Sequence, residues 1–346
     1  MVTPLVAILG AGASRGSGDY PLPTHGPVPG IVPPLTVDLF DERLYSDVLR
    51  QYDMAHQAGR FITRELAEDD ALGLEQALHG LGESEFDHLK HMAIAVPPYL
   101  QHLLHDVSDS RYADALHYDR LIERLLRLPY VFFVSLNYDV MLDRRLNGHH
   151  QLADLDAYID NSRNWSLIKP HGSVTWFHPA SEQFAPATPP ADLSWDSTDF
   201  RCVPPDASLL TVRGPHPMET SGKTERYPAL AMPEGPDDTL VLPDAHRDFF
   251  LGKLQSTQEI DVLVIGYSGL DKQILDLIAS ANCKLRHMTV VDQDLATATK
   301  VVERFKASGL DPLWRIVVDG DFGSWVSGGG LNRLVDEYDG PYPRSS

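Results

Sequence analysis

Cysteine is nearly absent from this chain of 346 residues, which contains only Cys202 and Cys283. Two thiolates cannot build a four-cysteine zinc site, and they cannot form the disulfide framework that stabilises small secreted domains. We therefore expect a cytoplasmic, reducing setting and no zinc ribbon. The pairs His88/His91 and His102/His105 have an i, i+3 spacing that could hold a metal, but solvated or capping histidines are the commoner explanation, so we expect no bound metal.

Long hydrophobic runs are also missing. The longest apolar stretches, such as residues 131–136, are far shorter than the ~20 residues that a membrane-spanning helix needs. The opening residues MVTPLVAILGAGAS resemble a signal peptide superficially, but the first basic residue is Arg15, and a signal peptide begins with a positively charged segment. We expect neither secretion nor membrane insertion.

Positive charge is scarce, because 29 Lys and Arg face 49 Asp and Glu, for a net charge of −20. Such a field repels phosphate backbones, so we expect no direct nucleic-acid partner. A local pocket for a small anionic ligand remains compatible with this charge. The hydrophobic fraction of 43% is ordinary for a globular protein with a sizeable core.

Short apolar runs alternate with helical patterns along much of the chain. A run rich in β-branched and aromatic residues without polar alternation is typical of a strand buried on both faces. This alternation predicts an α/β fold with a Rossmann-like parallel sheet flanked by helices. The expected strands cover residues 4–9, 130–136, 261–265, 288–291 and 314–318. We also expect Trp314 and Trp325 to pack the last strand and helix against the core.

The core of this single domain is expected to be discontinuous, over about residues 1–40, 111–178 and 251–339. Residues 41–110 read as a helical insertion, because apolar residues recur there at helical spacing. Residues 179–250 read as a proline-rich insertion or lid, since twelve of the 26 prolines fall between Pro179 and Pro243.

A glycine-rich segment directly follows the first expected strand. Glycines allow backbone N–H groups to approach a pyrophosphate closely, and a serine hydroxyl would add a donor. The dinucleotide fingerprint GxGxxG would have its third glycine at position 15, where this chain has Arg15. A tight strand-to-helix turn is the alternative explanation. The residues concerned are Gly10, Ala11, Gly12, Ala13 and Ser14.

Two further groups of polar residues follow apolar segments: one follows the expected strand at residues 130–136, and the other follows Leu167-Ile168. Asn137 and Asp139 in SLNYD would lie at the carboxyl end of the sheet, where ligands bind in open parallel sheets. Asp139 could instead cap a helix over residues 140–146. His171, held between Pro170 and Gly172 in KPHGS, suits a fixed general base, although most histidines are structural or exposed.

Two further strand ends carry candidate ligand-binding residues. GYSGLD supplies Gly266 and Ser268 directly after a buried strand, with a simple glycine turn and Asp271 as a helix N-cap as the alternative. Asp292 ends the next strand, where a carboxylate can accept hydrogen bonds from ribose hydroxyls. A turn or cap is the alternative for Asp292.

Together these motifs resemble the sirtuin superfamily in order and spacing. GAGAS resembles its phosphate loop, SLNYD its Gln-Asn motif, KPHGS its His-Gly motif, and GYSGLD its Gly-Ser motif. The chain departs from the protein deacylases of that family. Leu136 replaces the glutamine, and a proline-rich stretch with Cys202 replaces the four-cysteine zinc ribbon.

The pattern looks like the sirtuin-like domains of bacterial anti-phage systems, which hydrolyse NAD to nicotinamide and ADP-ribose and deplete the infected cell in abortive infection. The helical segment containing LEQAL also resembles theirs. The resemblance implies NAD as the substrate and Asn137 and His171 as the catalytic residues. It implies NAD binding by the other matched positions, which are Gly10, Ala11, Gly12, Ala13, Ser14, Asp139, Gly266 and Ser268. Asp292 is a further candidate for NAD binding from its place at the strand end alone.

Other functions remain open at this point. Protein deacylation or ADP-ribosyl transfer would use the same NAD chemistry, but would need a peptide channel. A third possibility is a regulator that senses NAD without cleaving it. The resemblance further implies a homo-oligomer and a protein partner, such as a hexameric DNA translocase or helicase, or a nucleic-acid-guided protein, that supplies an activating trigger.

Overall fold

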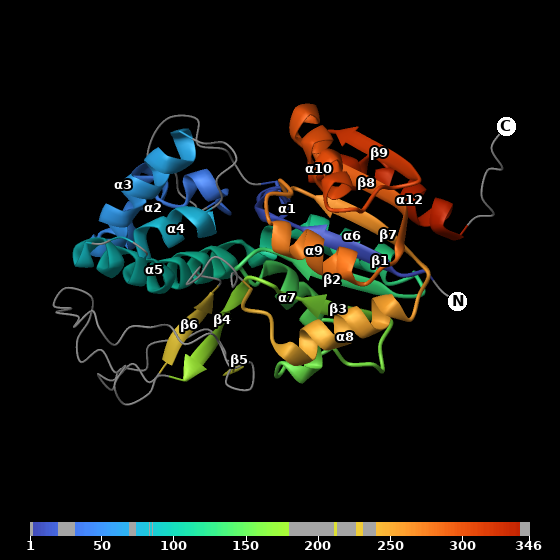
Figure 1. Ribbon diagram of the computed structural model, residues 1–346, viewed down its shortest axis with the longest axis horizontal. Helices are drawn as coiled ribbons and strands as arrows, with labels where there is room; N and C mark the ends of the chain where they lie inside the picture. Colours follow the sequence, from blue (N-terminus) through green and yellow to red (C-terminus); the bar gives the residue numbers. More distant parts are fainter. Residues whose placement is uncertain are drawn as a thin grey trace.

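The computed structural model describes residues 3–19, 32–68, 74–82, 84, 86–179, 211–212, 226–230 and 240–339. Its centre is a six-stranded sheet with the order β3-β2-β1-β7-β8-β9 (Figure 1). All neighbouring strands in it are parallel. The strands are β1 Leu5–Leu9, β2 Val131–Ser135, β3 Trp165–Ile168, β7 Glu259–Ile265, β8 Lys284–Asp292 and β9 Trp314–Asp319.

This strand order confirms the expected Rossmann-like parallel sheet. Counted along the chain, the six strands lie in the order 3-2-1-4-5-6, which is that of doubly wound nucleotide-binding sheets. The chain reverses its winding direction between β1 and β7. In such sheets, ligands bind beyond the carboxyl ends of the strands at this reversal.

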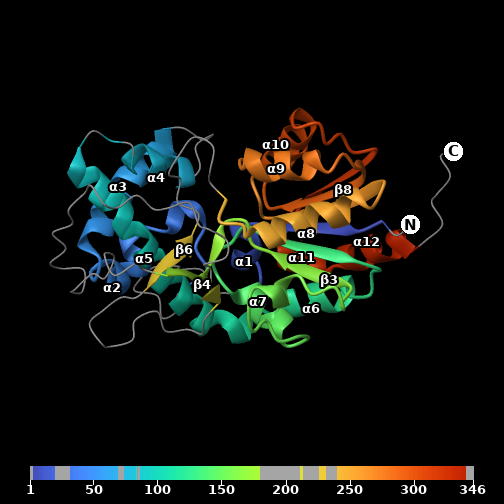
Figure 2. The same ribbon diagram turned by 60° about the horizontal axis from the view of Figure 1, so that its bottom comes forward.

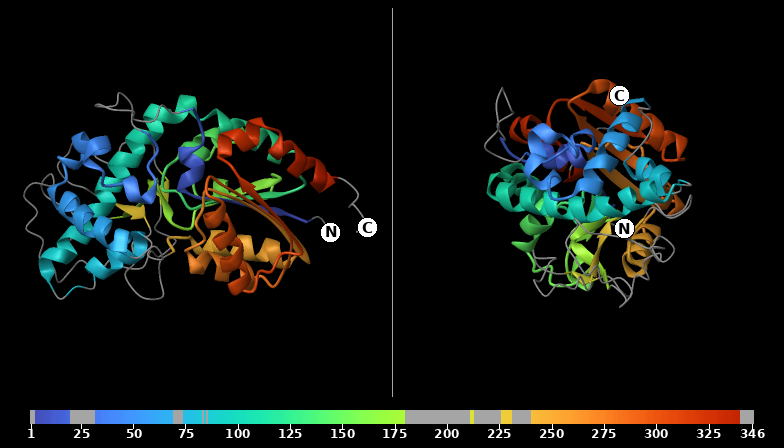
Figure 3. Two further views of the ribbon diagram at one scale, coloured as in Figure 1. Left: turned by 90° about the horizontal axis from the view of Figure 1, so that it is seen from above. Right: turned by 90° about the vertical axis from the view of Figure 1, so that its left-hand side faces the viewer.

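Helices cover both faces of the sheet, which explains why its strands lack polar alternation. Side chains of β1 alternate: Leu5, Ala7 and Leu9 join one buried cluster, whereas Val6 and Ile8 join another on the opposite face. Figure 3 shows the sheet between its two helical layers. The helices around it are α6 Leu116–Leu125, α7 Met141–Asn147, α8 Asp244–Gln255, α9 Lys272–Ser280, α10 Leu295–Ala307, α11 Phe322–Ser327 and α12 Gly330–Asp339.

All five expected strands are present, but β3 was not predicted. It has only four residues, WSLI, and this run is too short to predict a strand from the sequence. Beside the sheet, the four helices α2 to α5 pack together (Figures 1 and 2). They include the expected helical face, because Leu74, Ala77, Leu78 and Leu81 are all buried. The segment contains α1 Ala11–Arg15, α2 Glu42–Leu49, α3 Asp53–Glu68, α4 Leu74–Gly82 and α5 Asp87–Arg111.

Most of the expected proline-rich insertion lies outside the described residues. Its described parts include β5 Thr211–Val212 and β6 Arg226–Leu230, which flank β4 Gly172–Pro179 in a small antiparallel sheet. Helix α8 begins at Asp244, so the expected boundary at residue 250 falls inside a helix of the core. The reason is packing, since Phe250 of α8 meets Phe132 of β2 edge to face at 4.9 Å between ring centroids. No helix in the described ranges has the length and apolar composition needed to cross a membrane.

The two tryptophans near the carboxyl end of the chain differ in solvent exposure. Trp325 is buried, as expected. The prediction for Trp314 is wrong, because its side chain is 60% exposed. It lies on β9, the outermost strand, where no further strand of the described chain continues the sheet.

Candidate active site

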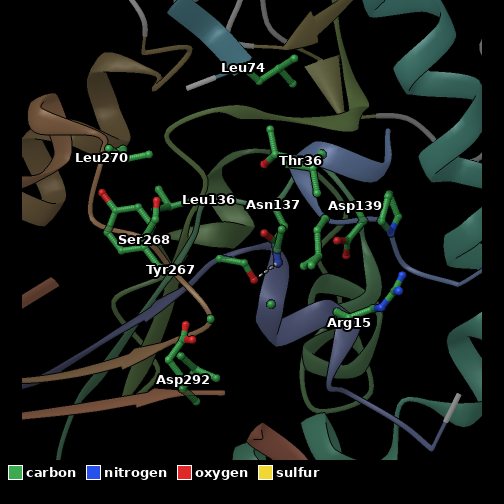
Figure 4. A pocket seen from close by; sticks show the side chains of 18 of the residues that line it. Arg15, Thr36, Leu74, Leu136, Asn137, Asp139, Tyr267, Ser268, Leu270 and Asp292 are labelled. Carbon is green, nitrogen blue, oxygen red and sulfur yellow. Dashed lines mark hydrogen bonds between the residues drawn. The ribbon is translucent and has the colours of Figure 1, made fainter. Parts of the chain in front are cut away.

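A cavity of about 620 Å³ opens at the carboxyl ends of β1, β2, β7 and β8 (Figure 4). The structure brings most of the expected site residues together in its wall, although they come from segments far apart in the sequence. Ala13 and Ser14 do not line the cavity, because both are buried behind it. The expected residues that line it are Gly10, Ala11, Gly12, Asn137, Asp139, His171, Gly266, Ser268 and Asp292.

The glycines of the two central loops pack directly against each other. Gly12 donates its N–H to the Gly266 carbonyl at 3.0 Å, and Gly10 donates to Ile265 at 3.0 Å. A Cβ at Gly10 would lie 2.4 Å from the Gly266 oxygen, and a Cβ at Gly266 would lie 2.4 Å from the Gly12 carbonyl carbon. The tight-turn alternative therefore holds for these glycines, whose close approach joins β1 to β7 at the reversal point.

Gly266→Ala should lower the free energy of unfolding by about 3 kcal/mol. Gly266 has a φ of +57°, which is costly for a residue with a Cβ, and the added carbon would collide with backbone rather than with a movable side chain. Urea unfolding measures the change. Gly252→Ala is the matched control, because nothing lies within 4 Å of its Cβ position in α8, and alanine there should stabilise by about 0.5–1 kcal/mol. Equal effects of the two substitutions would contradict the close-packing explanation.

Ser14 connects three polar groups beneath the cavity floor. Its hydroxyl donates to Asp139 Oδ2 at 2.7 Å and accepts from Asn137 Nδ2 at 2.9 Å. Since the only hydroxyl hydrogen points to Asp139, the Tyr118 hydroxyl at 2.9 Å is the donor in that contact. The structure thus differs from the expected role of Ser14 as a phosphate donor, because its hydrogen is committed to Asp139.

Asn137 is held in one orientation by this network. Its amide nitrogen donates to Ser14 Oγ and to the Gly10 carbonyl, both at 2.9 Å. With both amide hydrogens engaged, the amide oxygen is the atom suited to accept a hydrogen bond from a ligand. Figure 4 shows Asn137 on the cavity floor beside Asp139.

Asp139 is buried and has a partner on each carboxylate oxygen. Oδ2 accepts from Ser14, and Oδ1 accepts the Met141 N–H at 3.0 Å, at the start of α7. The Met141 contact supports the start of the helix, as the cap alternative expected, and Asp139 also lines the cavity. Burial raises the pKa of Asp139, and the charge of Lys169 and these hydrogen bonds offset only part of that effect.

Lys169 is a fully buried cation beneath the site. Its Nζ donates to the Asp139 main-chain carbonyl at 2.6 Å and to Asp143 Oδ2 at 2.9 Å. Asp143 also accepts from the Tyr158 hydroxyl at 3.1 Å. The lysine thereby ties the KPHGS segment to the SLNYD segment and fixes His171 relative to Asn137.

His171 faces an acceptor at each ring nitrogen. Nδ1 lies 3.2 Å from the Leu136 carbonyl, and Nε2 is in hydrogen-bond contact with Asp271 Oδ2. Asp271 was expected only as a helix cap, and it does cap α9 by accepting the Ile274 N–H at 3.2 Å. No sequence signal marked it as the partner of His171, because the two lie 100 residues apart.

Asp271→Asn should remove a pH-dependent contribution to stability. Burial raises the pKa of Asp271, but hydrogen bonding and charge from His171 outweigh it, so the pKa lies below its ordinary value. A lowered carboxylate pKa stabilises the fold above the unfolded value of about 3.9, and this stabilisation disappears as the pH falls through the folded value. We expect the wild type to exceed the variant by about 2 kcal/mol at pH 7. Urea titrations should show the difference shrinking below about pH 4, and a constant difference would contradict this pairing.

The far side of the cavity contains the GYSGLD loop and the end of β8. Arg304 of α10 donates to the Ser268 carbonyl and so holds this loop. Asp292 accepts the Asp294 N–H at 3.0 Å, as the turn alternative expected, and it also lines the cavity. Burial raises the pKa of Asp292.

Arg15 is the one Lys or Arg side chain among the described residues that line the cavity. Its guanidinium donates to the Pro33 carbonyl at 2.9 Å and lies 3.5 Å from Asp38. Sequence reasoning treated Arg15 only as a departure from a glycine fingerprint. Among the described residues, no group of three His, Cys, Asp or Glu side chains is arranged to hold a metal ion.

Comparisons with known proteins return structural similarity only. No family model and no curated protein matches the chain. A structure reported for the mechanism and regulation of Sir2 enzymes aligns with 97% of this chain and 92% of its own, at 14% identity and a TM-score of 0.39. A Sir2 complex with an inhibitor, 2′-O-acetyl-ADP-ribose and a deacetylated peptide aligns with 96% of this chain and 94% of its own, at 12% identity and a TM-score of 0.37. These values are too low to assign the chain to that family.

Proposed function

We propose that this cavity binds NAD+ and hydrolyses it to nicotinamide and ADP-ribose. The observation that carries the proposal is the convergence of Asn137 and the His171–Asp271 pair beside the glycine loops at the reversal point of the sheet. An oriented amide and a histidine–carboxylate pair suit a reaction that needs a positioned water and a proton acceptor. The motif resemblance to NAD-hydrolysing sirtuin-like domains supports the same choice of substrate.

In the proposed reaction, the bond between C1′ of the ribose and the nicotinamide nitrogen breaks, and its electron pair leaves with neutral nicotinamide. The oxocarbenium-like C1′ is then attacked by water, as in glycoside hydrolysis. The Asn137 amide oxygen positions the ribose hydroxyl or the water. The proton released by the water passes to His171 and then to solvent.

His171 can accept this proton only through a ring nitrogen that a ligand can reach. Asp271 lines the cavity, so the Nε2 contact with Asp271 is the one that a substrate hydroxyl would replace. Asp139 lines the cavity, so its carboxylate would oppose positive charge at C1′. Lys169 and the two hydrogen bonds offset part of the rise that burial causes in the pKa of Asp139.

The test is the release of nicotinamide and ADP-ribose from NAD+ by the purified chain, followed by chromatography. Parallel reactions with an acylated peptide distinguish deacylation, which would form O-acyl-ADP-ribose, and labelled NAD+ detects ADP-ribose transferred to protein. Formation of free ADP-ribose in the absence of peptide supports hydrolysis. If calorimetry shows NAD+ binding and no cleavage product forms, even in extracts of phage-infected cells, hydrolysis is wrong. The chain is then a regulator that senses NAD+ without cleaving it.

Asp292→Asn should relax discrimination between NAD+ and NADP+. A carboxylate at this strand end accepts from the adenosine 2′-hydroxyl and repels a 2′-phosphate. We expect the ratio of kcat/KM for the two dinucleotides to fall by about tenfold, which is ~1.4 kcal/mol. Asp294→Asn is the control, because Asp294 caps α10 and does not line the cavity. The specificity role of Asp292 is wrong if both variants retain the wild-type ratio.

The biological setting proposed here is anti-phage defence by NAD depletion in the bacterial cytoplasm. An NAD hydrolase that is always active would deplete its own host, so the proposal includes a trigger supplied by a protein partner. A hexameric DNA translocase or a nucleic-acid-guided protein would connect the invading DNA to this enzyme. The net charge of −20 fits a basic protein surface better than direct contact with DNA.

A further inference from the structure

The two edges of the main sheet differ in how they are covered. At one edge, all four residues of β3 are buried. At the other, β9 has four exposed and two half-buried residues. Trp314 is 60% exposed and Ile316 is 47% exposed, whereas large apolar side chains are normally buried. Figure 1 shows β9 as the outermost strand of the sheet.

The main chain of β9 has one side that faces no strand of the described chain. Gly320, directly after β9, donates its N–H to the Asp292 carbonyl at the end of β8 at 3.0 Å. Because N–H and C=O directions alternate along a strand, Ile316 and Val318 also direct theirs toward β8. Arg315, Val317 and Asp319 therefore direct their main-chain groups outward. Such an edge is a template for another strand.

Native edges are usually protected against pairing by lysine, proline or a bulge. The strand WRIVVD contains no lysine or proline, and its register with β8 is continuous from Trp314 to Asp319. It carries one positive and one negative residue, Arg315 and Asp319, on the same face and four positions apart. This spacing is self-complementary in an antiparallel arrangement.

We propose that β9 pairs with β9 of a second copy of this chain, antiparallel about a twofold axis at Val317. Residues at equal distances before and after Val317 then lie opposite each other. Arg315 of each copy faces Asp319 of the other, and Ile316 faces Val318. The outward main-chain groups of Arg315 and Asp319 form a hydrogen-bonded pair, as do those of the two Val317 residues, and Trp314 lies opposite Gly320, which has no side chain to obstruct it. The two sheets become one continuous sheet.

The charge pattern selects a second copy over an unrelated strand. Opposite charges across an antiparallel pair stabilise it, and like charges at the same positions destabilise it. The twofold axis forms the Arg315–Asp319 pair twice, with no other change in either chain. A C2 interface of this kind is isologous and closed, so the assembly stops at a dimer.

Analytical ultracentrifugation of the full chain over a range of concentrations tests the proposal. The wild type should dimerise, and Arg315→Asp or Asp319→Arg alone should weaken the dimer by at least tenfold in Kd, because each places like charges opposite each other twice. The double variant Arg315→Asp with Asp319→Arg should dimerise again. A mixture of the two single variants should form a heterodimer, since each then supplies the charge that the other lacks.

A second pair of variants separates edge pairing from general loss of apolar surface. Ile316→Lys should abolish the dimer, whereas Phe86→Lys should not, because Phe86 is also exposed (62%) but directly precedes α5 and is not part of β9. Circular dichroism confirms that each variant is folded. A wild type that stays monomeric at every concentration, or a dimer that none of the charge variants weakens, would overturn the proposal, which does not depend on NAD+ cleavage.

Discussion

His171→Ala is expected to lower the rate of nicotinamide release by about a thousandfold while leaving NAD+ affinity within a fewfold of the wild type. General acid–base catalysis is worth roughly 10²–10⁴ in rate. The imidazole is well placed for it, because it lines the cavity and the Leu136 carbonyl holds its Nδ1 side, so that Nε2 can face a substrate. Most of the cavity wall lies elsewhere, in the glycine loops and around Asp292. Single-turnover product release and calorimetric binding measure the two effects separately.

Asn137→Ala should show the same separation of rate from affinity, because the proposed role of its amide is to position a reacting group rather than to anchor the dinucleotide. His102→Ala is the matched control. His102 is half-buried, contacts Tyr52 at 3.2 Å and lies outside the cavity, so the variant should retain wild-type turnover. Full turnover in His171→Ala would remove this residue from the mechanism, and equal losses in the control would indicate a general effect on folding.

The second large effect is expected from Lys169→Met, which should lower the free energy of unfolding by about 3–5 kcal/mol. Removing one partner of a buried ion pair leaves the other charge uncompensated. Lys169 is fully buried and Asp143 nearly so, and methionine fills a similar volume without supplying the charge or the two hydrogen bonds. Urea unfolding at neutral pH measures the loss.

Lys272→Met serves as the matched control. Its partner Asp276 lies 3.9 Å away in an exposed i,i+4 pair, and such pairs contribute at most about 0.5 kcal/mol. Lys169→Met combined with Asp143→Asn should recover part of the lost stability, because it removes the uncompensated carboxylate. A Lys169→Met variant as stable as the control would show that the buried pair contributes little to folding.

The sheet could be predicted because its strands are hydrophobic on both faces. Val131 to Ser135 has no polar alternation, and helices on each side explain why. Once those strands are parallel, their carboxyl ends must meet at one edge. This is why Gly10, Asn137, Gly266 and Asp292 could be grouped before their distances were known.

Side-chain partners could not be predicted in the same way, because they depend on directions that hydrophobic patterns do not encode. Asp271 satisfies a helix-cap pattern whether or not a histidine lies beside it. The hydroxyl of Ser14 points to Asp139 rather than into the cavity, although its place after the glycines indicated the opposite. Trp314 looked like a core residue because aromatic side chains usually are, and only the strand order reveals that β9 is an edge.

The Asp271 carboxylate connects the cavity to helix α9. One of its oxygens accepts the Ile274 amide and the other contacts His171, so the first turn of α9 shares a carboxylate with the cavity wall. A ligand that draws His171 away from Asp271 changes the charge that caps this helix. Amide hydrogen exchange at Ile274 would therefore record occupancy of the cavity, in a segment that itself forms no part of the cavity wall.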